Sequence, residues 1–269
     1  MTTHKIALLA GDGIGPEIMA EAVKVLKLIE ERNSVSFDLQ SALFGACAWF
    51  ETGKSFPDDT IAICDNADAI LKGTIGLSHE ESKQIPVDEQ PERGGLLPMR
   101  RRYQTYANFR PVALPPELAH FSPLRPEIIG DGIDLVIIRE LVGGLYFGSK
   151  ETGVNDQGRR YVHEMLEYDE DQIRQVLEVA FKLAMKRKKS LTNVHKSNVL
   201  KSSVLWNEIL DEVHSDYPEV SVDHILVDAA ATYLCLNPTR FDVMVMENMF
   251  GDIKRNVLCW STLVFKAFD

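Results

Sequence analysis

Short apolar runs alternate along the chain with longer segments whose apolar residues recur every three or four positions. The short runs are typical of buried strands, and the longer periodic segments are typical of amphipathic helices. The predicted strands are residues 5–11, 69–76, 134–141, 191–196 and 241–248. The predicted helices are residues 16–32, 170–189 and 202–217. This alternation predicts an α/β fold with a mostly parallel sheet.

Two of the predicted helices have a clear apolar face. In helix 16–32 the face consists of Ile18, Ala22, Val25, Leu26 and Ile29, and Pro16 suits the first helical position. In helix 170–189 the face consists of Ile173, Val176, Leu177, Ala180, Phe181 and Ala184. We expect both faces to be buried. The polar stretch 76–95 is predicted to be a long loop.

Length and composition favour a globular protein of about two domains. The chain has 269 residues, of which 45% are hydrophobic and 26% charged. The formal net charge of -11 disfavours nonspecific binding to nucleic acid or to an anionic membrane. No apolar stretch is long enough to span a membrane or to form a signal-peptide core. The four cysteines form no C-x-x-C pair, which argues against a zinc site and favours a reducing, cytoplasmic location.

The turn "GDGIGPE" (11–17) links the first predicted strand to the first predicted helix. It lacks the G-x-G-x-x-G spacing of the common dinucleotide fingerprint. Its glycines are equally well explained by a tight backbone reversal. The turn alone therefore does not predict a ligand.

Arginines are concentrated in an otherwise acidic chain. Arg100, Arg101, Arg102 and Arg110 lie in "MRRRYQTYANFRP", and Arg139 closes a predicted strand. Guanidinium groups bind carboxylates through two parallel hydrogen bonds. A solvated basic turn explains Arg101 and Arg102 equally well, whereas a ligand role is favoured for Arg110 and Arg139.

Five further side chains are candidates, and they lie at the ends of predicted strands or near glycines. Tyr146 follows two glycines, and Lys196 ends a strand, where a lysine can be a buried base. His195 beside it is more typical of a packing or hydrogen-bonding residue. Asp228 and Asp252 are candidate ligands of Mg²⁺, a cation that prefers oxygen donors.

Together and in this order, these motifs resemble the β-decarboxylating dehydrogenases of 2-hydroxy acids, the isocitrate/isopropylmalate dehydrogenase family. The resemblance covers residues 5–253 and is most specific to the members that act on isopropylmalate. The motifs that carry it are "GDGIGPEI", "LLPMRRRYQTYANFRP", "RELVGGLYFG", "VHKSNVLKSSVLW", "VDAAATYL" and "RFDVMVMENMFGDI". It implies a two-domain α/β fold distinct from the Rossmann fold.

The resemblance also implies site residues and cofactors. Arg100, Arg110 and Arg139 are expected to bind the two substrate carboxylates. Tyr146 is expected to protonate the enol left by CO₂ loss, and Lys196 to help remove the hydroxyl proton. Asp228 and Asp252 are expected to bind Mg²⁺ or Mn²⁺. NAD is the expected cofactor, with binding positions at Ile14, Glu92 and Asn198. The family is homodimeric, and Lys196 and Asp228 would serve the neighbouring subunit's site.

The expected reaction is oxidative decarboxylation of (2R,3S)-3-isopropylmalate to 2-oxoisocaproate, a step of leucine biosynthesis. Leu96 and Leu97 favour this branched alkyl substrate, because they would form an apolar wall for its isopropyl group. The family usually has "PExGLL" here, whereas this chain has "PERGGLL", whose extra residue puts the place of Glu92 in question. Tartrate and D-malate are the alternative substrates.

The resemblance implies three regions: a first, cofactor-side domain (1–105), a second, substrate and dimerisation domain (106–253), and a divergent tail (254–269). The family continues beyond the "GDI" motif with a second carboxylate and the adenosine-binding loop, so the chain is expected to lack the end of its first domain. Asn256 occupies the position of that carboxylate, which predicts weaker metal binding. The alternative function is an inactive remnant or a dimerising module.

Overall fold

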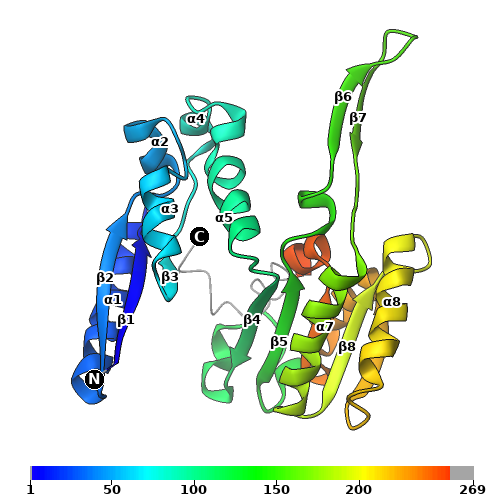
Figure 1. Ribbon diagram of the computed structural model, residues 1–269. Helices are drawn as coiled ribbons and strands as arrows, with labels where there is room; N and C mark the ends of the chain where they lie inside the picture. Colours follow the sequence, from blue (N-terminus) through cyan, green and yellow to red (C-terminus); the bar gives the residue numbers. More distant parts are fainter. Residues whose placement is uncertain (1, 255–269) are drawn as a thin grey trace. The chain divides into compact units, whose positions relative to one another are not determined.

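The structure is a computed structural model that describes residues 2–254, in two compact units divided between Tyr103 and Gln104 (Figure 1). Each unit is an α/β structure, as predicted. Residues 255–269, which include Asn256 and nearly all of the predicted tail, lie outside the described residues. None of the helices among residues 2–254 is long and apolar enough to cross a membrane.

The first unit is built on a three-stranded parallel sheet of order β2-β1-β3. Its strands are β1 (Thr2–Leu9), β2 (Val35–Ala42) and β3 (Ala69–Lys72). Its α-helices are α1 (Gly15–Arg32), α2 (Ala46–Thr52), α3 (Asp58–Asp65), α4 (His79–Ser82) and α5 (Leu97–Arg102). A 3-10 turn (Val87–Glu89) and a π-helix (Pro91–Leu96) precede α5. The stretch predicted as one long loop, 76–95, therefore contains several short helical segments.

The predicted apolar face of α1 is only partly correct. Met19 is buried and Ala22 and Leu26 are partly buried, but Val25 and Ile29 are 57% and 38% exposed. The helix therefore turns the Met19, Ala22 and Leu26 side inward. Periodicity assigned Val25 and Ile29 to the inner face because it records which residues are apolar, not which of them the sheet covers.

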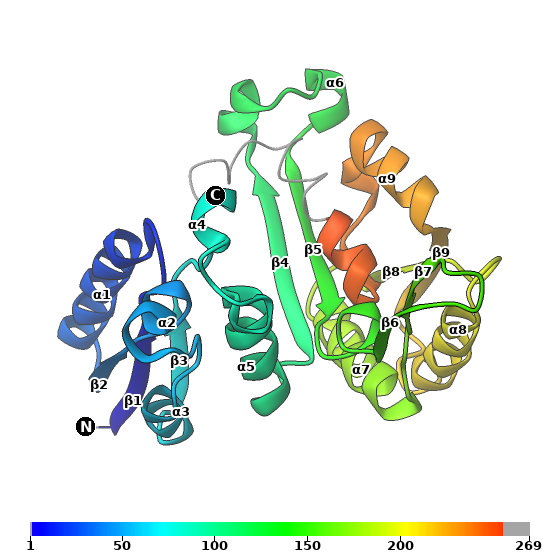
Figure 2. The same ribbon diagram turned by 90° about the horizontal axis from the view of Figure 1, so that it is seen from above.

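The second unit contains a five-stranded sheet of order β4-β5-β10-β8-β9, in which only β4 runs antiparallel to its neighbour (Figure 2). Its strands are β4 (Ala107–Leu114), β5 (Ile133–Glu140), β8 (Ser190–His195), β9 (Ser221–Leu226) and β10 (Val243–Met246). Its helices are α6 (Pro126–Ile129), α7 (Glu170–Met185), α8 (Lys201–His214), α9 (Val227–Leu236) and the segment 248–254. Short 3-10 turns span Pro116–Phe121, Gly144–Tyr146 and Pro238–Arg240.

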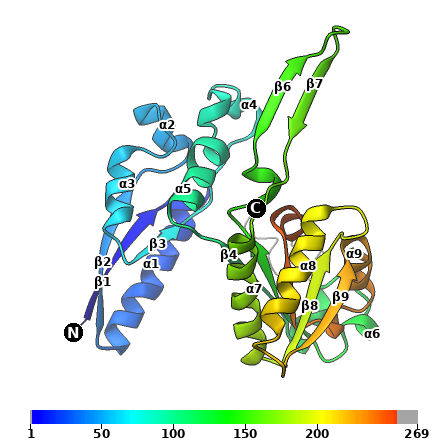
Figure 3. The ribbon, with the colours of Figure 1, turned by 45° about the vertical axis from the view of Figure 1, so that its right-hand side comes forward.

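An antiparallel hairpin, β6 (Lys150–Val154) and β7 (Arg160–Glu164), extends away from this sheet as a two-stranded arm (Figure 3). Val154 and Val162 on the arm are 64% and 65% exposed. The sequence prediction missed this hairpin, as well as β2, β4 and β9.

Helices cover both faces of the five-stranded sheet. On one face α7 and α8 pack over alternate residues of β5 and β10, including Val136 and Val245. On the other face α9 packs over the intervening residues, including Ile137 and Met244. All six predicted inner residues of α7 are fully buried, which confirms its predicted face.

Helix α7 ends at Met185, before the basic segment that was predicted to close it. Lys189 has a positive φ of 55°, and its backbone N–H donates to the carbonyl of Ala184. The chain thus turns out of the helix toward β8. The start of α7 is fixed by a capping box, in which the side chains of Asp169 and Gln172 each accept the other's backbone N–H.

Candidate active site

In the first unit, the Gly-rich turn connects β1 to α1 and contacts Thr74, just after the carboxyl end of β3. Gly11 has φ 78°, and a Cβ there would lie 1.9 Å from the carbonyl oxygen of Thr74. The buried carboxylate of Asp12 accepts the backbone N–H groups of Ala46 and Cys47, which begin α2, at 2.9 and 2.8 Å. The glycine and the aspartate are therefore explained by backbone packing. Ile14, the N-cap of α1, is 42% exposed beside this turn.

Most of "PERGGLL" forms a π-helical turn, Pro91–Leu96. The backbone N–H of Leu97 donates to the carbonyl of Glu92, five residues earlier, as a π-helix requires. Such one-residue expansions are frequent at functional sites. Glu92 is exposed and lies near Gly76, where a built Cβ would be 3.4 Å from its Oε1. Leu96 and Leu97 remain partly buried at the junction with α5.

The three consecutive arginines of α5 differ in environment. Arg102 binds Asp65, with Nε donating to Oδ1 at 2.9 Å, and this contact lowers the pKa of the Asp65 carboxyl. The Tyr103 hydroxyl donates to the same oxygen at 2.9 Å. Arg102 therefore ties α5 to α3. Arg101 is exposed and Arg100 is partly buried.

In the second unit, Arg139, Tyr146 and Asp252 meet at the carboxyl end of β5. Arg139 is 3% exposed, and its Nη1 forms an ion pair with Asp252. The Tyr146 hydroxyl donates to Asp252 Oδ2 at 2.9 Å, and the Arg139 guanidinium lies 5.6 Å from the Tyr146 ring centroid. Asn248 Oδ1 accepts both Nε and Nη2 of Arg139, at 3.0 and 2.7 Å. The structure thus brings together three of the predicted site residues.

The surroundings of Tyr146 hold its hydroxyl in the protonated form. Burial, followed by the hydrogen bond to Asp252, raises the pKa of the hydroxyl. In this arrangement the phenol is a weaker acid than a free tyrosine.

Gly251 explains how Arg139 fits against the helical segment 248–254. A Cβ at Gly251 would lie 2.5 Å from Cγ and 2.6 Å from Cβ of Arg139. The stem of the arginine therefore lies directly against the helix backbone. A glycine directly before Asp252 allows the helix and the arginine to approach closely enough for the ion pair.

Arg110 lies on the same sheet face as Arg139. Strands β4 and β5 pair so that Asn108 is opposite Arg139 and Arg110 is opposite Ile137. Directly opposed residues of antiparallel strands point to the same face, as do residues two positions apart. The two predicted carboxylate-binding arginines of this unit thus come from neighbouring strands.

Lys196 and Asp228 form a separate pair. Lys196 follows β8, and its ammonium donates to Asp228 Oδ1 on α9 at 2.8 Å. This bond lowers the pKa of the Asp228 carboxyl. Asn198 is exposed in the turn before α8. His195 is buried, with Nδ1 accepting the backbone N–H of Ser197 at 3.2 Å, and burial lowers its pKa, in agreement with the predicted packing role.

Among residues 2–254 of one chain, no group of three or more histidine, cysteine or acidic side chains is arranged to hold a metal ion. Asp228 and Asp252 have the carboxylate chemistry that Mg²⁺ and Mn²⁺ prefer.

The sequence prediction missed four residues that support this cluster: Glu140, Tyr168, Glu247 and Asn248. Asn248 and Glu247 lie within the motif that also provides Asp252, so their proximity to it was available from the sequence. Tyr168 lies outside every motif, and nothing local marks it.

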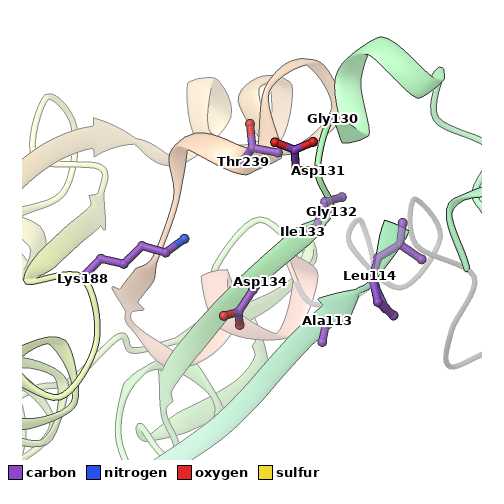
Figure 4. Close-up of a pocket in the computed structure, with 10 residues that line it drawn as sticks. Ala113, Leu114, Gly130, Asp131, Gly132, Ile133, Asp134, Lys188 and Thr239 are labelled. Carbon is purple, nitrogen blue, oxygen red and sulfur yellow. The ribbon is translucent and has the colours of Figure 1, made fainter. Parts of the chain in front are cut away.

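A surface hollow of about 590 Å³ lies at the opposite end of the sheet (Figure 4). It is lined by residues at the start of β5, including Asp131 and Asp134, and by Lys188. Arg139 lies at the carboxyl end of β5 and Tyr146 comes shortly after it. This hollow is therefore separate from the candidate site.

Comparisons with known proteins agree with these features. A sequence profile described as isocitrate/isopropylmalate dehydrogenase matches residues 5–260, which extends past Ile253. The chain is 46% identical to 3-isopropylmalate dehydrogenase of Carboxydothermus hydrogenoformans, over 93% of this chain and 66% of that protein. It is 42% identical to the enzyme of the same name from Haemophilus influenzae, over 94% of this chain and 70% of that protein.

Solved structures agree on the fold. The isocitrate dehydrogenase of Methylococcus capsulatus superposes with a TM-score of 0.81 and 29% identity, over 96% of this chain and 71% of that chain. The chain thus spans about two thirds of the length of the relatives it matches. It belongs to the isocitrate/isopropylmalate dehydrogenase family.

Proposed function

We propose that this chain, or a longer protein that contains it, oxidatively decarboxylates (2R,3S)-3-isopropylmalate to 2-oxoisocaproate in leucine biosynthesis, with NAD⁺ as oxidant. The observation that carries the proposal is the Arg139–Tyr146–Asp252 cluster. In this cluster the Asp252 carboxylate contacts both the buried guanidinium of Arg139 and the hydroxyl of Tyr146. Relatives named 3-isopropylmalate dehydrogenase support the choice of substrate.

In the proposed reaction, a bound NAD⁺ would accept the hydride from the substrate C2, and the hydroxyl on C2 would lose a proton. The C3 carboxylate then leaves as CO₂, and its bonding electrons form an enolate. A proton delivered to C3 completes the product. Tyr146 is proposed as the donor of that proton, because its hydroxyl bonds Asp252 and its ring lies beside Arg139, an arginine proposed to bind a substrate carboxylate.

Arginines are proposed to hold the two carboxylates of the substrate. Arg139 and Arg110 share one sheet face, and Arg100 is proposed as the third arginine of the set. Arg139 is pre-oriented, because Asn248 occupies its Nε and Nη2. A substrate carboxylate would exchange with Asp252 for the remaining Nη1 contact.

Lys196 and Asp228 are proposed to act on the substrate hydroxyl of a neighbouring subunit's site. Asp228 and Asp252 are proposed as the carboxylates that would hold the metal ion. A Mg²⁺ or Mn²⁺ bound by these carboxylates would polarise the substrate oxygens. Ile14, Glu92 and Asn198 are proposed to contact NAD, and the proposed assembly is a cytoplasmic homodimer.

Leu96 and Leu97 are proposed to contact the isopropyl group. Both remain partly buried after the π-helical turn, at the start of the helix that carries Arg100. Tartrate and D-malate are the alternative substrates, since they share the 2-hydroxy acid chemistry but lack the branched alkyl group. An inactive, dimerising module is the alternative from another class.

The test is NADH formation by the purified full chain with NAD⁺, Mg²⁺ and 3-isopropylmalate. We expect turnover that exceeds the turnover with tartrate, D-malate or isocitrate. A preference for tartrate or D-malate would reassign the substrate. Absence of turnover in folded protein, together with no NAD⁺ binding by calorimetry, would support the inactive module. Tyr146→Phe should abolish product formation. Tyr217→Phe is the matched control and should not.

A further inference from the structure

Behind the Arg139–Tyr146–Asp252 cluster lie two buried carboxyls that share one tyrosine. Glu140 at the end of β5 is fully buried, and Glu247 after β10 is 6% exposed. The Tyr168 hydroxyl lies 2.9 Å from Glu140 Oε2 and 3.3 Å from Glu247 Oε2. The backbone N–H of Asn248 donates to the same hydroxyl at 3.0 Å. None of these groups has a role in the proposed reaction so far.

Burial raises the pKa of both carboxyls, and counting hydrogens favours Glu247 as the one that carries a proton. The Tyr168 hydroxyl has one hydrogen to donate, and it is nearer to Glu140. Glu140 also accepts the backbone N–H groups of Val142 and Gly143, at 2.7 and 3.0 Å, so it is satisfied as a carboxylate. Glu247 can therefore bond the hydroxyl only by donating a proton of its own.

The environment of Glu247 supports this assignment. The ionisable groups that face it are Glu140 on β5, Tyr168 before α7, His195 at the end of β8, and Tyr146 in the 3-10 turn. These are a carboxylate, two phenols and a buried imidazole whose pKa is lowered. Burial raises the pKa of Glu247 to about 7.

Two sets of contacts connect this cluster to the candidate site. In the first, Tyr168 holds the backbone of Asn248, whose Nδ2 also donates to the carbonyl of Gly143 at 2.9 Å. This fixes the amide whose Oδ1 holds Arg139. In the second, the Tyr168 ring lies against Gly143 and Gly144, where a built Cβ would approach its atoms to 2.6 and 2.5 Å. This pair of glycines leads directly into the turn that carries Tyr146.

We propose that Tyr168 and a protonated Glu247 are positioning residues that aim Arg139 and Tyr146 at the substrate. The proton on Glu247, the Tyr168 hydroxyl and the Glu140 carboxylate form one directed chain of hydrogen bonds. The Tyr168 hydroxyl at the centre of this chain also accepts the backbone N–H of Asn248, the residue whose side-chain carbonyl holds Arg139. The inference deepens the proposed function, and its consequences for catalysis rest on that function.

The first test does not require turnover. The Nε–H of Arg139 is buried and bonded to Asn248, so it should give a slowly exchanging side-chain signal in ¹H–¹⁵N NMR spectra, assigned by its loss in Arg139→Lys. The signal should persist in Glu247→Gln, because a carboxamide N–H replaces the acid O–H as donor. It should broaden or vanish in Tyr168→Phe, and persist in the control Tyr217→Phe.

The Arg139 signal should be lost in Glu140→Gln, in contrast to Glu247→Gln. A carboxamide there would turn an N–H toward either the backbone donors or the Tyr168 hydroxyl. Asn248→Ala removes the carbonyl directly and keeps the test available if Tyr168→Phe does not fold. An unchanged Arg139 signal in Tyr168→Phe and Asn248→Ala, or equal losses in Glu247→Gln and Glu140→Gln, would overturn the proposal.

The second test measures steady-state kinetics of the folded variants. Tyr168→Phe should raise KM for 3-isopropylmalate about tenfold, the effect of losing one well-placed hydrogen bond, while KM for NAD⁺ stays unchanged. Glu247→Gln should keep KM for 3-isopropylmalate within about twofold. A parallel rise in both KM values would indicate general damage and overturn the proposal. If the wild-type chain lacks turnover but shows the expected NMR pattern, the proposed function fails and the positioning role stands.

Discussion

At the residue scale, backbone positions without side chains decide where the reactive groups lie. Gly251 admits the stem of Arg139, and Gly143 and Gly144 admit the ring of Tyr168. Each of these close approaches would be blocked by a single methyl group. The glycines in "VGG" and "FGDI" are therefore explained by the arginine and the tyrosine that pack against them.

Glu247 makes the stability of the fold depend on pH. Its pKa rises from the ordinary value of 4.5 to about 7 in the folded chain. Between these values the folded chain keeps a proton that the unfolded chain has released, so the free energy of unfolding falls as pH rises through this window. The loss amounts to about 3 kcal/mol and is complete above pH 7.

Urea unfolding of Glu247→Gln and wild type at several pH values measures this effect. We expect the variant to gain stability relative to wild type as pH rises from 4.5 to 7, and the difference to remain constant above that range. Glu208→Gln, an exposed site on α8, should show no such trend. A difference that does not change with pH would show that Glu247 is ionised alike in both states.

At the element scale, α7 is fixed at its start by hydrogen bonds and along its length by burial. Asp169 Oδ1 accepts the backbone N–H of Gln172 at 2.8 Å. Asp169→Ala should therefore lower the free energy of unfolding by about 1 kcal/mol, as measured by urea unfolding. Asp169→Asn, which keeps a side-chain acceptor, should lose far less. An equal loss in Asp171→Ala would indicate that helix-dipole charge, and not the cap, is responsible.

The elements differ in how well the sequence predicted them. The buried face of α7 was predicted in full, because its apolar residues recur at helical spacing and the sheet covers all of them. The face of α1 was predicted in part because burial there depends on which side the sheet covers. Strand β4 and the hairpin were missed, since their exposed residues break the apolar pattern. Strand pairing across distant segments has no local signal.

The candidate site was predictable where its residues lie in motifs. Arg139, Tyr146 and Asp252 were all named from the sequence, and the structure brings them into contact. The roles of these residues in catalysis remain predictions. Tyr168 and Asn248 were not predicted, because the hydrogen bond that links them joins residues 80 positions apart in the sequence. A tyrosine in a polar segment has no feature that distinguishes it before the fold is known.

At the scale of the whole molecule, the proposed site joins residues of two subunits. Arg139, Tyr146 and Asp252 form one cluster, and Lys196 pairs with Asp228 in another. If each reaction needs the first cluster of one chain and the second pair of its partner, defects in different clusters should complement each other. Defects in the same cluster should not.

Co-assembly of Tyr146→Phe with Lys196→Met tests this. Each variant alone has two defective sites, but a mixed dimer has one site in which both contributing halves are intact. Random pairing makes half of the dimers mixed, so NADH formation should recover to about a quarter of the wild-type rate. Tyr146→Phe with Arg139→Lys is the matched control and should show no recovery, because both defects lie in the same cluster. No recovery in the test pair would place each site within a single chain, and recovery in the control would show that Tyr146 and Arg139 serve different sites.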